Sequence, residues 1–256
     1  MSNNESRFVW YDLISSNRAA SRDFYAKVAG WKSEPFGGPG SAYDMFLTES
    51  GPVGGVTELG EKLEQMGVPP HWMGYVKVAD VDKAAVQAKE LGGSIMKEAF
   101  DIPQVGRIAI LLDPQGAAIG IFAPEKGGEA LGDDQKPGEF SWHELLTSDA
   151  EAGLAFYEKL FGWEKTEAMD TGDGTMYQMY KEPSMGVSLG GVMKKPEMMP
   201  QSAWLYYIKV GSLDTALGAV TDGGGKVMHG PMEVPGGDRV AQCADPQGAA
   251  FALVGR

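Results

Sequence analysis

The alternation of apolar and polar positions predicts short strands that are interrupted by single amphipathic helices. Up to residue 122, strand-like runs lie at 8–14, 42–48, 53–57, 71–78, 94–97, 106–112 and 117–122. Two helices stand among them, one from the N-cap Asn17 to Ala29 and one from the cap Asp80 to Leu91. Each helix follows one strand and precedes several others. The pattern therefore predicts two consecutive β-α-β-β-β modules.

The same pattern recurs in the second half of the chain. RDFYAKVAGW at 22–31 is matched by GLAFYEKLFGW at 153–163, and DPQGAA occurs at both 113–118 and 245–250. Six pairs of identical residues lie the same 132 positions apart: Trp10 and Trp142, Phe24 and Phe156, Trp31 and Trp163, Trp72 and Trp204, Pro103 and Pro235, Asp113 and Asp245. A constant offset of this kind indicates a tandem duplication.

The duplication predicts two domains of similar fold. We expect a first domain at 1–125, a linker at 126–138 and a second domain at 139–256. The linker is rich in glycine, proline and charge and has no apolar periodicity. In the second copy, Asp149 and Ser212 are the expected helix caps. The chain then contains four modules, two in each half.

A helix that carries FYxxxxGW and a DPxG turn before the last strand, each present twice, resemble the vicinal oxygen chelate superfamily of glyoxalases, bleomycin resistance proteins and ring-cleaving dioxygenases. The resemblance covers nearly the whole chain apart from the tail and the linker. It implies an α+β fold in which the two β-α-β-β-β modules of each domain curl their sheets into one cup. The helices then lie outside the cup, and the ligand lies inside.

The family's metal site takes an inward His or Glu from the first and last strands of each module, and other residues stand at those positions here. The resemblance places the positions at Trp10, Met73 and Gly120 in the first half and at Trp142, Leu205 and Ala252 in the second. The remaining position falls in Gly54-Gly55 or Gly190-Gly191, a matching pair that is out of step with the other repeats. None of these side chains is a ligand for a divalent ion. We therefore expect no metal and no other cofactor.

Strand alternation predicts what lines the cups instead, because residues two apart share a face. In the first half this inward set is Trp10, Asp12, Met73, Tyr75 and Lys77, with His71 on the same face. In the second half it is Trp142, Glu144, Leu205, Tyr207 and Lys209. Each cup then combines a tryptophan, a carboxylate, a tyrosine and a lysine, which is typical of a small-molecule site with few polar groups.

The carboxylate and the tyrosine of each cup are the candidate catalytic residues. A carboxylate held away from water beside an indole has a raised pKa, which suits a general acid or base. This interpretation pairs Glu144 with Tyr207 and Asp12 with Tyr75. Because Glu144 is the longer carboxylate and methionines crowd the second half, we expect the working cup there. A structural role is the alternative, in which both carboxylates bind strand-end amides or lysines.

Four other polar residues are weaker candidates. Arg107 and Arg239 match across the repeat and would either hold an anionic ligand or pack across a domain interface. His71 begins a strand and is a candidate ligand contact. His143 neighbours Glu144 on a strand, so it is expected to face the helix layer as a hydrogen-bonded histidine.

Composition narrows the function classes. The formal charge of −13 argues against nucleic acid and anionic membrane surfaces as partners. The single cysteine, Cys243, excludes a disulfide framework and is expected to be a buried, unreactive thiol. No signal peptide or membrane span is recognisable, so a cytoplasmic location is expected. Two cups in one chain also predict a monomer or a weak homodimer.

Fold alone leaves the function open. We expect a glyoxalase-like protein that acts on a small aromatic or carbonyl-containing molecule by metal-independent lyase or isomerase chemistry. The first alternative is a non-catalytic protein of the bleomycin-resistance type that sequesters such a molecule between tryptophans. The second alternative is a metal-dependent glyoxalase or dioxygenase with unconventional ligands such as His71, His143 and Glu144.

Overall fold

The elements of the first half follow the predicted cycle. A computed structural model describes residues 6–126 and 134–256. In the first half the elements are β1 (Phe8–Ser15), α1 (Arg18–Val28), β2 (Lys32–Pro35), β3 (Tyr43–Thr48), β4 (Gly51–Glu58), α2 (Glu61–Gln65), β5 (His71–Lys77), α3 (Val81–Glu90), β6 (Ser94–Ile102), β7 (Gly106–Leu112) and β8 (Ala118–Pro124). Most of the expected linker, 126–138, lies outside the described residues.

The second half repeats this order without a counterpart of α2. Its elements are β9 (Phe140–Thr147), α4 (Ala150–Phe161), β10 (Glu164–Asp170), β11 (Met176–Lys181), β12 (Gly190–Lys194), β13 (Ala203–Lys209), α5 (Leu213–Asp222), β14 (Lys226–Glu233), β15 (Arg239–Ala244) and β16 (Ala250–Gly255). The four predicted helix caps are confirmed: in each case the cap side chain accepts a hydrogen bond from a backbone N–H of the first turn, at Asn17, Asp80, Asp149 and Ser212.

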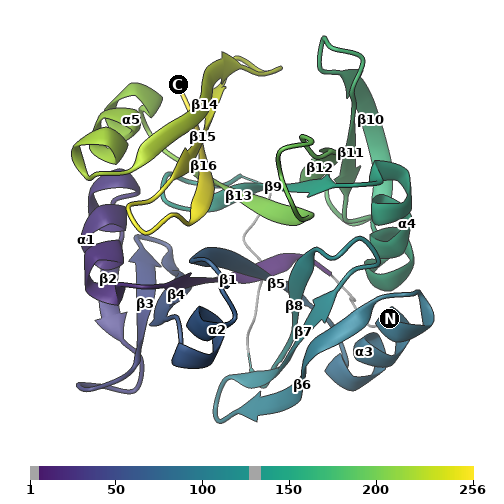
Figure 1. Cartoon of the computed structure of the whole chain (residues 1–256), viewed down its shortest axis with the longest axis horizontal. Coiled ribbons are helices and arrows are strands. Elements are labelled where there is room, and N and C mark those ends of the chain that lie inside the picture. Colours follow the sequence, from purple (N-terminus) through teal and green to yellow (C-terminus); the bar gives the residue numbers. More distant parts are fainter. Residues whose placement is uncertain (1–5, 127–133) are drawn as a thin grey trace. The chain divides into compact units, whose positions relative to one another are not determined.

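Each half of the chain forms one eight-stranded mixed sheet. The strand order is β2-β3-β4-β1-β5-β8-β7-β6 in the first half and β10-β11-β12-β9-β13-β16-β15-β14 in the second. Within a module the first strand pairs in parallel with the last, as β1 does with β4 and β5 with β8, and the remaining pairs are antiparallel. The α+β fold with four β-α-β-β-β modules is therefore confirmed (Figure 1).

The chain divides into two compact units, and these units do not coincide with the two sheets. Unit 1 contains Met1–Val9, Gly74–Asp133 and Trp142–Trp204, and unit 2 contains Trp10–Met73, Asp134–Ser141 and Leu205–Arg256. Unit 1 thus combines the second module of the first half with the first module of the second half, and unit 2 combines the other two. The domain bounds predicted from the repeat follow the sheets and stay a prediction.

Each unit places two helices side by side, α3 with α4 in unit 1 and α1 with α5 in unit 2 (Figure 1). None of the helices among the described residues is long and apolar enough to cross a membrane. The longer helices α1, α3, α4 and α5 bury apolar residues, which in α1 include Phe24, Tyr25 and Val28. The tyrosine of each FY motif is therefore a core residue.

A buried hydrogen-bond chain links the FY and DPQG motifs in each unit. In unit 2, Trp72 Nε1 donates to Tyr25 Oη at 2.9 Å, and that hydroxyl donates to Asp245 Oδ2 at 3.3 Å. In unit 1, Trp204, Tyr157 and Asp113 form the same chain, with distances of 3.1 and 3.0 Å. Burial raises the pKa of both aspartates. The repeated motifs thus hold modules from the two halves together within a unit.

Candidate functional site

The first strand of each half has one face toward the helices and one away from them. In β1, Tyr11 and Ser15 are buried, and Ser15 Oγ lies 2.7 Å from Ser21 Oγ in α1, which identifies the helix side. Trp10 and Asp12 alternate with them and are only half-buried. The two predicted site residues therefore share the face that the helices leave open.

In unit 2, Trp10 and Asp12 meet a residue from β3. The indole N–H of Trp10 is shared between Asp12 Oδ1 at 3.0 Å and Tyr43 Oη at 2.8 Å. Tyr43 in turn donates its hydroxyl proton to the same Asp12 oxygen, at 2.5 Å. Two donors thus converge on one carboxylate oxygen, and all three side chains are half-buried. We call Trp10, Asp12 and Tyr43 the Asp12 cluster.

The Tyr43 ring lies over a glycine in the neighbouring strand. Gly55 is the Cα partner of Asp12 in the parallel pair of β1 and β4. A Cβ atom added to Gly55 would lie 2.2 Å from the ring of Tyr43, so only glycine leaves room for it. The tyrosine ring therefore covers a position from which the family takes a metal ligand.

Unit 1 contains a matching arrangement, which we call the Glu144 cluster: Trp142, Glu144 and Tyr177. Trp142 Nε1 donates to Tyr177 Oη at 2.7 Å. A Cβ atom on Gly191 would lie 2.0 Å from the Tyr177 ring, and Gly191 is the Cα partner of Glu144. Glu144 is 4% exposed, so its carboxyl group is more deeply buried than that of Asp12.

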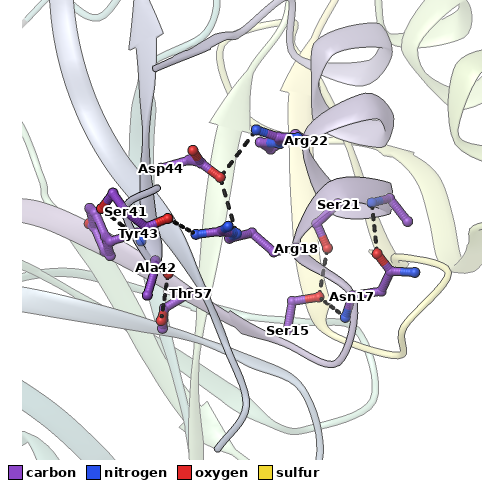
Figure 2. A network of polar contacts seen from close by, with 11 residues as sticks. Ser15, Asn17, Arg18, Ser21, Arg22, Ser41, Ala42, Tyr43, Asp44 and Thr57 are labelled. Carbon is purple, nitrogen blue, oxygen red and sulfur yellow. Dashed lines mark hydrogen bonds and ion pairs between the residues drawn. The ribbon is translucent and has the colours of Figure 1, made fainter. Parts of the chain in front are cut away.

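Buried ion pairs anchor the strand that carries Tyr43 (Figure 2). Asp44 is 2% exposed, and its Oδ2 lies 3.2 Å from Arg18 Nε and 3.3 Å from Arg22 Nη1. Arg18 also donates to the carbonyl of Ser41 at 2.7 Å. Because both arginines belong to α1, these contacts fix β3 against the helix. Tyr43, the preceding residue, then points to the opposite side.

The corresponding anchor in unit 1 is uncharged. Gln178 follows Tyr177 as Asp44 follows Tyr43, and its amide Nε2 donates to the carbonyls of Thr166 and Glu167, both at 3.2 Å. The amide joins β11 to β10 rather than to a helix. The two clusters therefore share a tyrosine and a glycine and differ in what holds the tyrosine strand.

The predicted catalytic tyrosines lie in other strands. Tyr75 is 6% exposed, and a Cβ on its Cα partner Gly120 would lie 2.2 Å from the Tyr75 ring. Tyr207 is 5% exposed and pairs with Ala252. Tyr75 belongs to unit 1 and Tyr207 to unit 2, so each predicted carboxylate–tyrosine pair has one member in each unit. Both pairings stay predictions.

The remaining strand residues of the predicted cups are placed as follows. Met73 and Leu205 are 4% and 6% exposed, whereas Lys77 and Lys209 are half-buried. Their backbone positions agree across the repeat. The backbone N–H of Lys77 donates to the carbonyl of Arg7, just before β1, and that of Lys209 donates to the carbonyl of Glu139, just before β9. Their contact with a ligand stays a prediction.

The two candidate histidines differ in burial. His143 is buried, stacks on Phe8 with ring centroids 4.1 Å apart, and has its Nδ1 2.8 Å from the carbonyl oxygen of Leu189. Burial lowers the pKa of His143 from 6.5 to about 4. His143 is therefore the hydrogen-bonded core histidine that the strand alternation predicts. His71 is only half-buried, and its Nδ1 lies 2.8 Å from the carbonyl oxygen of Pro69.

The two matched arginines form ion pairs with aspartates of the helix layer. Arg107 donates to both carboxylate oxygens of Asp82, at 2.8 and 2.9 Å, and to Asp101 at 2.9 Å. Arg239 forms an ion pair with Asp214 at 2.9 Å. Asp82 and Asp214 stand in the first turns of α3 and α5, so both guanidinium groups face the helix layer. Contact with an anionic ligand and packing across a domain interface stay predictions for both arginines.

The donor set for a metal is missing at the family's positions. Tyrosine rings cover Gly55, Gly191 and Gly120, and the other positions carry tryptophan, methionine, leucine or alanine. Among residues 6–126 and 134–256, no group of three or more His, Cys, Asp or Glu is arranged to hold a metal ion. The side chains present therefore do not fit the divalent ion that the family implies. His143, one of the unconventional ligands in the second alternative, is buried with its Nδ1 against the carbonyl oxygen of Leu189.

Tyr43 and Tyr177 are the site residues that sequence reasoning missed. They lie 134 positions apart rather than 132, because the second half is longer before its glycine pair. A search at the constant offset therefore passes over them. The repeated pairs Gly54-Gly55 and Gly190-Gly191 were the available signal, because a glycine inside a strand marks close approach by another group. Here that group is a tyrosine ring.

Comparison with known proteins agrees with this architecture. Residues 140–253 match the Glyoxalase/Bleomycin resistance protein/Dioxygenase superfamily. Two solved structures share the fold across 98% of this chain at 14% identity: the Mn(II)-bound glyoxalase from Novosphingobium aromaticivorans, with a TM-score of 0.65 over 82% of that chain, and the 2,3-dioxygenase LapB from Pseudomonas sp. KL28, with a TM-score of 0.66 over 92%.

Two relatives align along nearly the full length. The chain is 32% identical over 248 residues to a Mycobacterium tuberculosis protein named "Putative glyoxylase CFP32", covering 96% of this chain and 93% of the relative. It is 28% identical over 260 residues to "Anthracycline biosynthesis protein DauV" of Streptomyces sp., covering 96% and 92%. The fold, the repeated motifs and these alignments agree, and the chain belongs to the glyoxalase/bleomycin resistance protein/dioxygenase superfamily.

Proposed function

We propose that this glyoxalase-like protein catalyses proton transfer on a small aromatic molecule that contains a carbonyl group, in a reaction of the lyase or isomerase type. The observation that carries the proposal is the Asp12 cluster, in which a half-buried carboxylate lies beside a hydroxyl donor and an indole. A carboxylate and a hydroxyl in contact form an acid–base pair. No step of the proposed reaction uses a metal ion.

In the proposed reaction, Asp12 removes a proton from the carbon next to the carbonyl. The C–H bond breaks, its electron pair forms a carbon–carbon double bond, and the carbonyl oxygen becomes an enolate. When a second double bond is conjugated with the enolate, return of the proton to the far end of the conjugated system gives an isomer with a shifted carbon–carbon double bond. When the β carbon carries a leaving group, the carbonyl re-forms and the enolate electron pair makes a double bond between the α and β carbons. The substituent then leaves with the electron pair of its own bond and takes up the proton, which gives a lyase product. A hydrogen-bond donor aimed at the enolate oxygen stabilises the charge that develops there.

The exposure of the two carboxylates supports Asp12 as the working carboxylate, whereas the sequence alone predicts a working cup in the second half. A general base has to reach the carbon-bound proton, and Asp12 is half-buried whereas Glu144 is 4% exposed. Glu144 remains the second candidate, because it occupies the equivalent strand position.

An aromatic ligand agrees with the side chains of the cluster and with one relative. Trp10 and Tyr43 present flat rings next to the carboxylate, and aromatic rings stack favourably on such surfaces. The Streptomyces relative is named for anthracycline biosynthesis. An anthracycline has fused rings with carbonyl and hydroxyl groups, which is the ligand class proposed here. The mycobacterial relative carries the name "Putative glyoxylase CFP32", and that name favours a carbonyl substrate.

The alternative is a non-catalytic protein that sequesters the same class of ligand. The observation in its favour is that both units keep a tryptophan hydrogen-bonded to a tyrosine, Trp10 with Tyr43 and Trp142 with Tyr177. Two intact aromatic pairs suit two binding sites, whereas catalysis requires only one. A binder needs the aromatic rings and does not need the carboxylates.

Solvent deuterium exchange tests the proposal. The protein is incubated in D₂O with enolisable aryl ketones of one, two and three fused rings, and deuterium at the carbon next to the carbonyl is followed by NMR. We expect exchange well above the solvent rate with at least one ketone, and loss of exchange in the double variant Asp12→Asn/Glu144→Gln. A different result would identify a sequestering protein. In that case the wild-type protein binds the ketones without exchange, and binding survives the double substitution but is lost when Trp10→Ala is combined with Trp142→Ala.

A further inference from the structure

We infer that Tyr43 is the residue that donates a hydrogen bond to the carbonyl oxygen of the ligand. The inference rests on the proposed function and assigns the hydroxyl to a residue other than Tyr75, the predicted partner of Asp12. It also assigns the ligand class more narrowly, as an enolisable aryl ketone. Tyr177 keeps the corresponding place in unit 1.

The hydroxyl of Tyr43 is in contact with the proposed base. It donates to Asp12 Oδ1 at 2.5 Å and accepts from Trp10 Nε1 at 2.8 Å. When a carbonyl oxygen arrives, the hydroxyl turns its proton toward that oxygen and leaves Asp12. Asp12 Oδ1 then loses the hydrogen bond from Tyr43 and is available to accept the proton from the ligand carbon. The same movement of the Tyr43 proton thus stabilises the carbonyl oxygen and prepares Asp12 to accept the proton from carbon.

The position of Tyr43 is set before a ligand binds. Its ring rests on Gly55, where a Cβ atom would lie 2.2 Å away, and the next residue, Asp44, is bound to Arg18 and Arg22 of α1. A donor that is already held in place needs no reorganisation as charge develops on the oxygen. Tyr75 is less suited to this role, because it is 6% exposed whereas Tyr43 is half-buried.

The ligand class follows from the chemistry of the cluster. Trp10 Nε1 already donates to Asp12 and Tyr43, so the Tyr43 hydroxyl is the donor that turns toward the ligand, and its partner atom is an acceptor oxygen. The carboxylate of Asp12 repels an anionic group at the same point, which disfavours a carboxylate or phosphate ligand. Two aromatic rings beside these donors suit a flat ring system. A neutral ketone conjugated to an aromatic ring meets all three conditions.

Binding of a ketone and its deoxygenated analogue tests the inference independently of turnover. The probes are 1-tetralone and tetralin, which have the same rings with and without the carbonyl, and dissociation constants are measured by quenching of tryptophan fluorescence. We expect the wild-type protein to prefer 1-tetralone by about tenfold, as one hydrogen bond provides. In Tyr43→Phe this preference should disappear while the affinity for tetralin is unchanged. Tyr11→Phe, on the helix side of β1, is the matched control and should keep the preference.

Three results would overturn the inference. The wild-type protein shows no preference for the ketone, the preference survives in Tyr43→Phe, or it disappears in Tyr75→Phe or Tyr177→Phe instead. These results are distinct from failure of the proposed function, which is the absence of deuterium exchange. A protein that prefers the ketone through Tyr43 and never exchanges its protons has the inferred contact without the proposed chemistry.

Discussion

The Asp12 cluster of unit 2 and the Glu144 cluster of unit 1 have the same aromatic residues but different surroundings. In both, a tryptophan N–H donates to a tyrosine whose ring covers a glycine, at Gly55 and at Gly191. In unit 2 the carboxylate is half-buried, and a buried aspartate anchors the tyrosine strand to a helix. In unit 1 the carboxylate is 4% exposed, and an amide takes the place of the anchor.

The difference indicates which features depend on packing and which were free to diverge after the duplication. A ring and a glycine that fit each other constrain one another, because neither can be changed alone without a clash or a cavity. The carboxylate and the anchor are not under that mutual constraint. We therefore regard the tyrosine–glycine pair as the shared scaffold and the polar residues around it as the part that distinguishes the two clusters.

The largest expected effect comes from the glycine under the tyrosine ring. Gly55→Ala introduces a Cβ atom 2.2 Å from the Tyr43 ring, and it should reduce the free energy of unfolding by about 3 kcal/mol. Gly191→Ala should cost a similar amount, since its Cβ would lie 2.0 Å from Tyr177. Urea unfolding measures both changes.

A double-mutant cycle isolates the contact between ring and glycine. In the background Tyr43→Ala, the ring is gone, so Gly55→Ala should cost less than about 1 kcal/mol. The same should hold for Gly191→Ala in the background Tyr177→Ala. Equal costs of Gly55→Ala with and without the ring would show that the shared scaffold is not the tyrosine–glycine pair.

The free energy of unfolding should depend on pH through His143 in unit 1, which has no histidine counterpart in unit 2. His143 stacks on Phe8 in unit 1, and the equivalent residue Tyr11 stacks on Phe140 in unit 2, with centroids 3.8 Å apart. The folded-state pKa of His143, about 4, is below the unfolded value of 6.5, so the unfolded chain binds the proton more tightly. Its contribution to stability is present above pH 6.5 and is lost as the pH falls toward 4.

His143→Tyr copies the residue of unit 2 and should remove this sensitivity. Between pH 7 and pH 5, the wild-type protein should lose about 2 kcal/mol more of its free energy of unfolding than the variant does. Urea unfolding at several pH values provides the comparison, and other titrating groups cancel in the difference. Parallel stability–pH curves for the two proteins would show that His143 is not the source.

The anchor of the tyrosine strand should matter more in unit 2 than in unit 1. Asp44→Asn removes the charge that pairs with Arg18 and Arg22, and a lost partner of a buried charge is costly. The two arginines are 25% and 36% exposed, which reduces the expected loss to about 1.5 kcal/mol. Gln178→Ala should cost less than half as much. A larger loss from Gln178→Ala would reverse the order of the two anchors.

The smallest expected effect is a gain. In unit 2, Ser21 Oγ donates to Gln247 Oε1 at 3.0 Å, whereas Gln115 Oε1, the equivalent atom in unit 1, is buried with no hydrogen-bond partner among the described residues. Gly153 stands where unit 2 has Ser21, and a Cβ there would lie 3.6 Å from Gln115 Oε1. Gly153→Ser should therefore raise the free energy of unfolding by about 1 kcal/mol.

Gly153→Ala is the control for that gain. It adds the helix propensity of a residue with a Cβ but supplies no hydroxyl, so it should stabilise less than serine does. Crowding against the methyl group of Thr147, 3.2 Å from the added Cβ, affects both variants equally. Equal stability of the two variants would mean that the serine hydroxyl does not form a stabilising hydrogen bond with Gln115 Oε1.

Strand alternation and capping residues predicted much of this fold. The helix caps at Asn17, Asp80, Asp149 and Ser212 are correct because a polar side chain before an apolar periodic stretch has few other roles. Two elements were missed. Every residue of β2 is exposed, so no apolar pattern marks it. The short helix α2 has no buried residue and no equivalent in the second half.

The candidate site was less predictable, because its contacts join strands that are far apart in the sequence. Alternation placed Trp10 and Asp12 on one face, but it could not show that Tyr43, in β3, reaches the same carboxylate. Nor could alternation show that Arg107, in β7, binds Asp82 of α3 and Asp101 of β6. Sequence spacing describes one strand at a time, whereas a site depends on register between strands.

The most direct test of the account compares Asp12→Asn and Glu144→Gln singly in the deuterium-exchange assay with the aryl ketones. We predict that Asp12→Asn lowers the exchange rate at saturating ketone at least about 100-fold while its dissociation constant stays within tenfold, because general acid–base catalysis contributes about that much. Glu144→Gln should leave the rate within about threefold of wild type. The reverse result, with exchange lost in Glu144→Gln and kept in Asp12→Asn, would contradict the assignment of the working site to the Asp12 cluster.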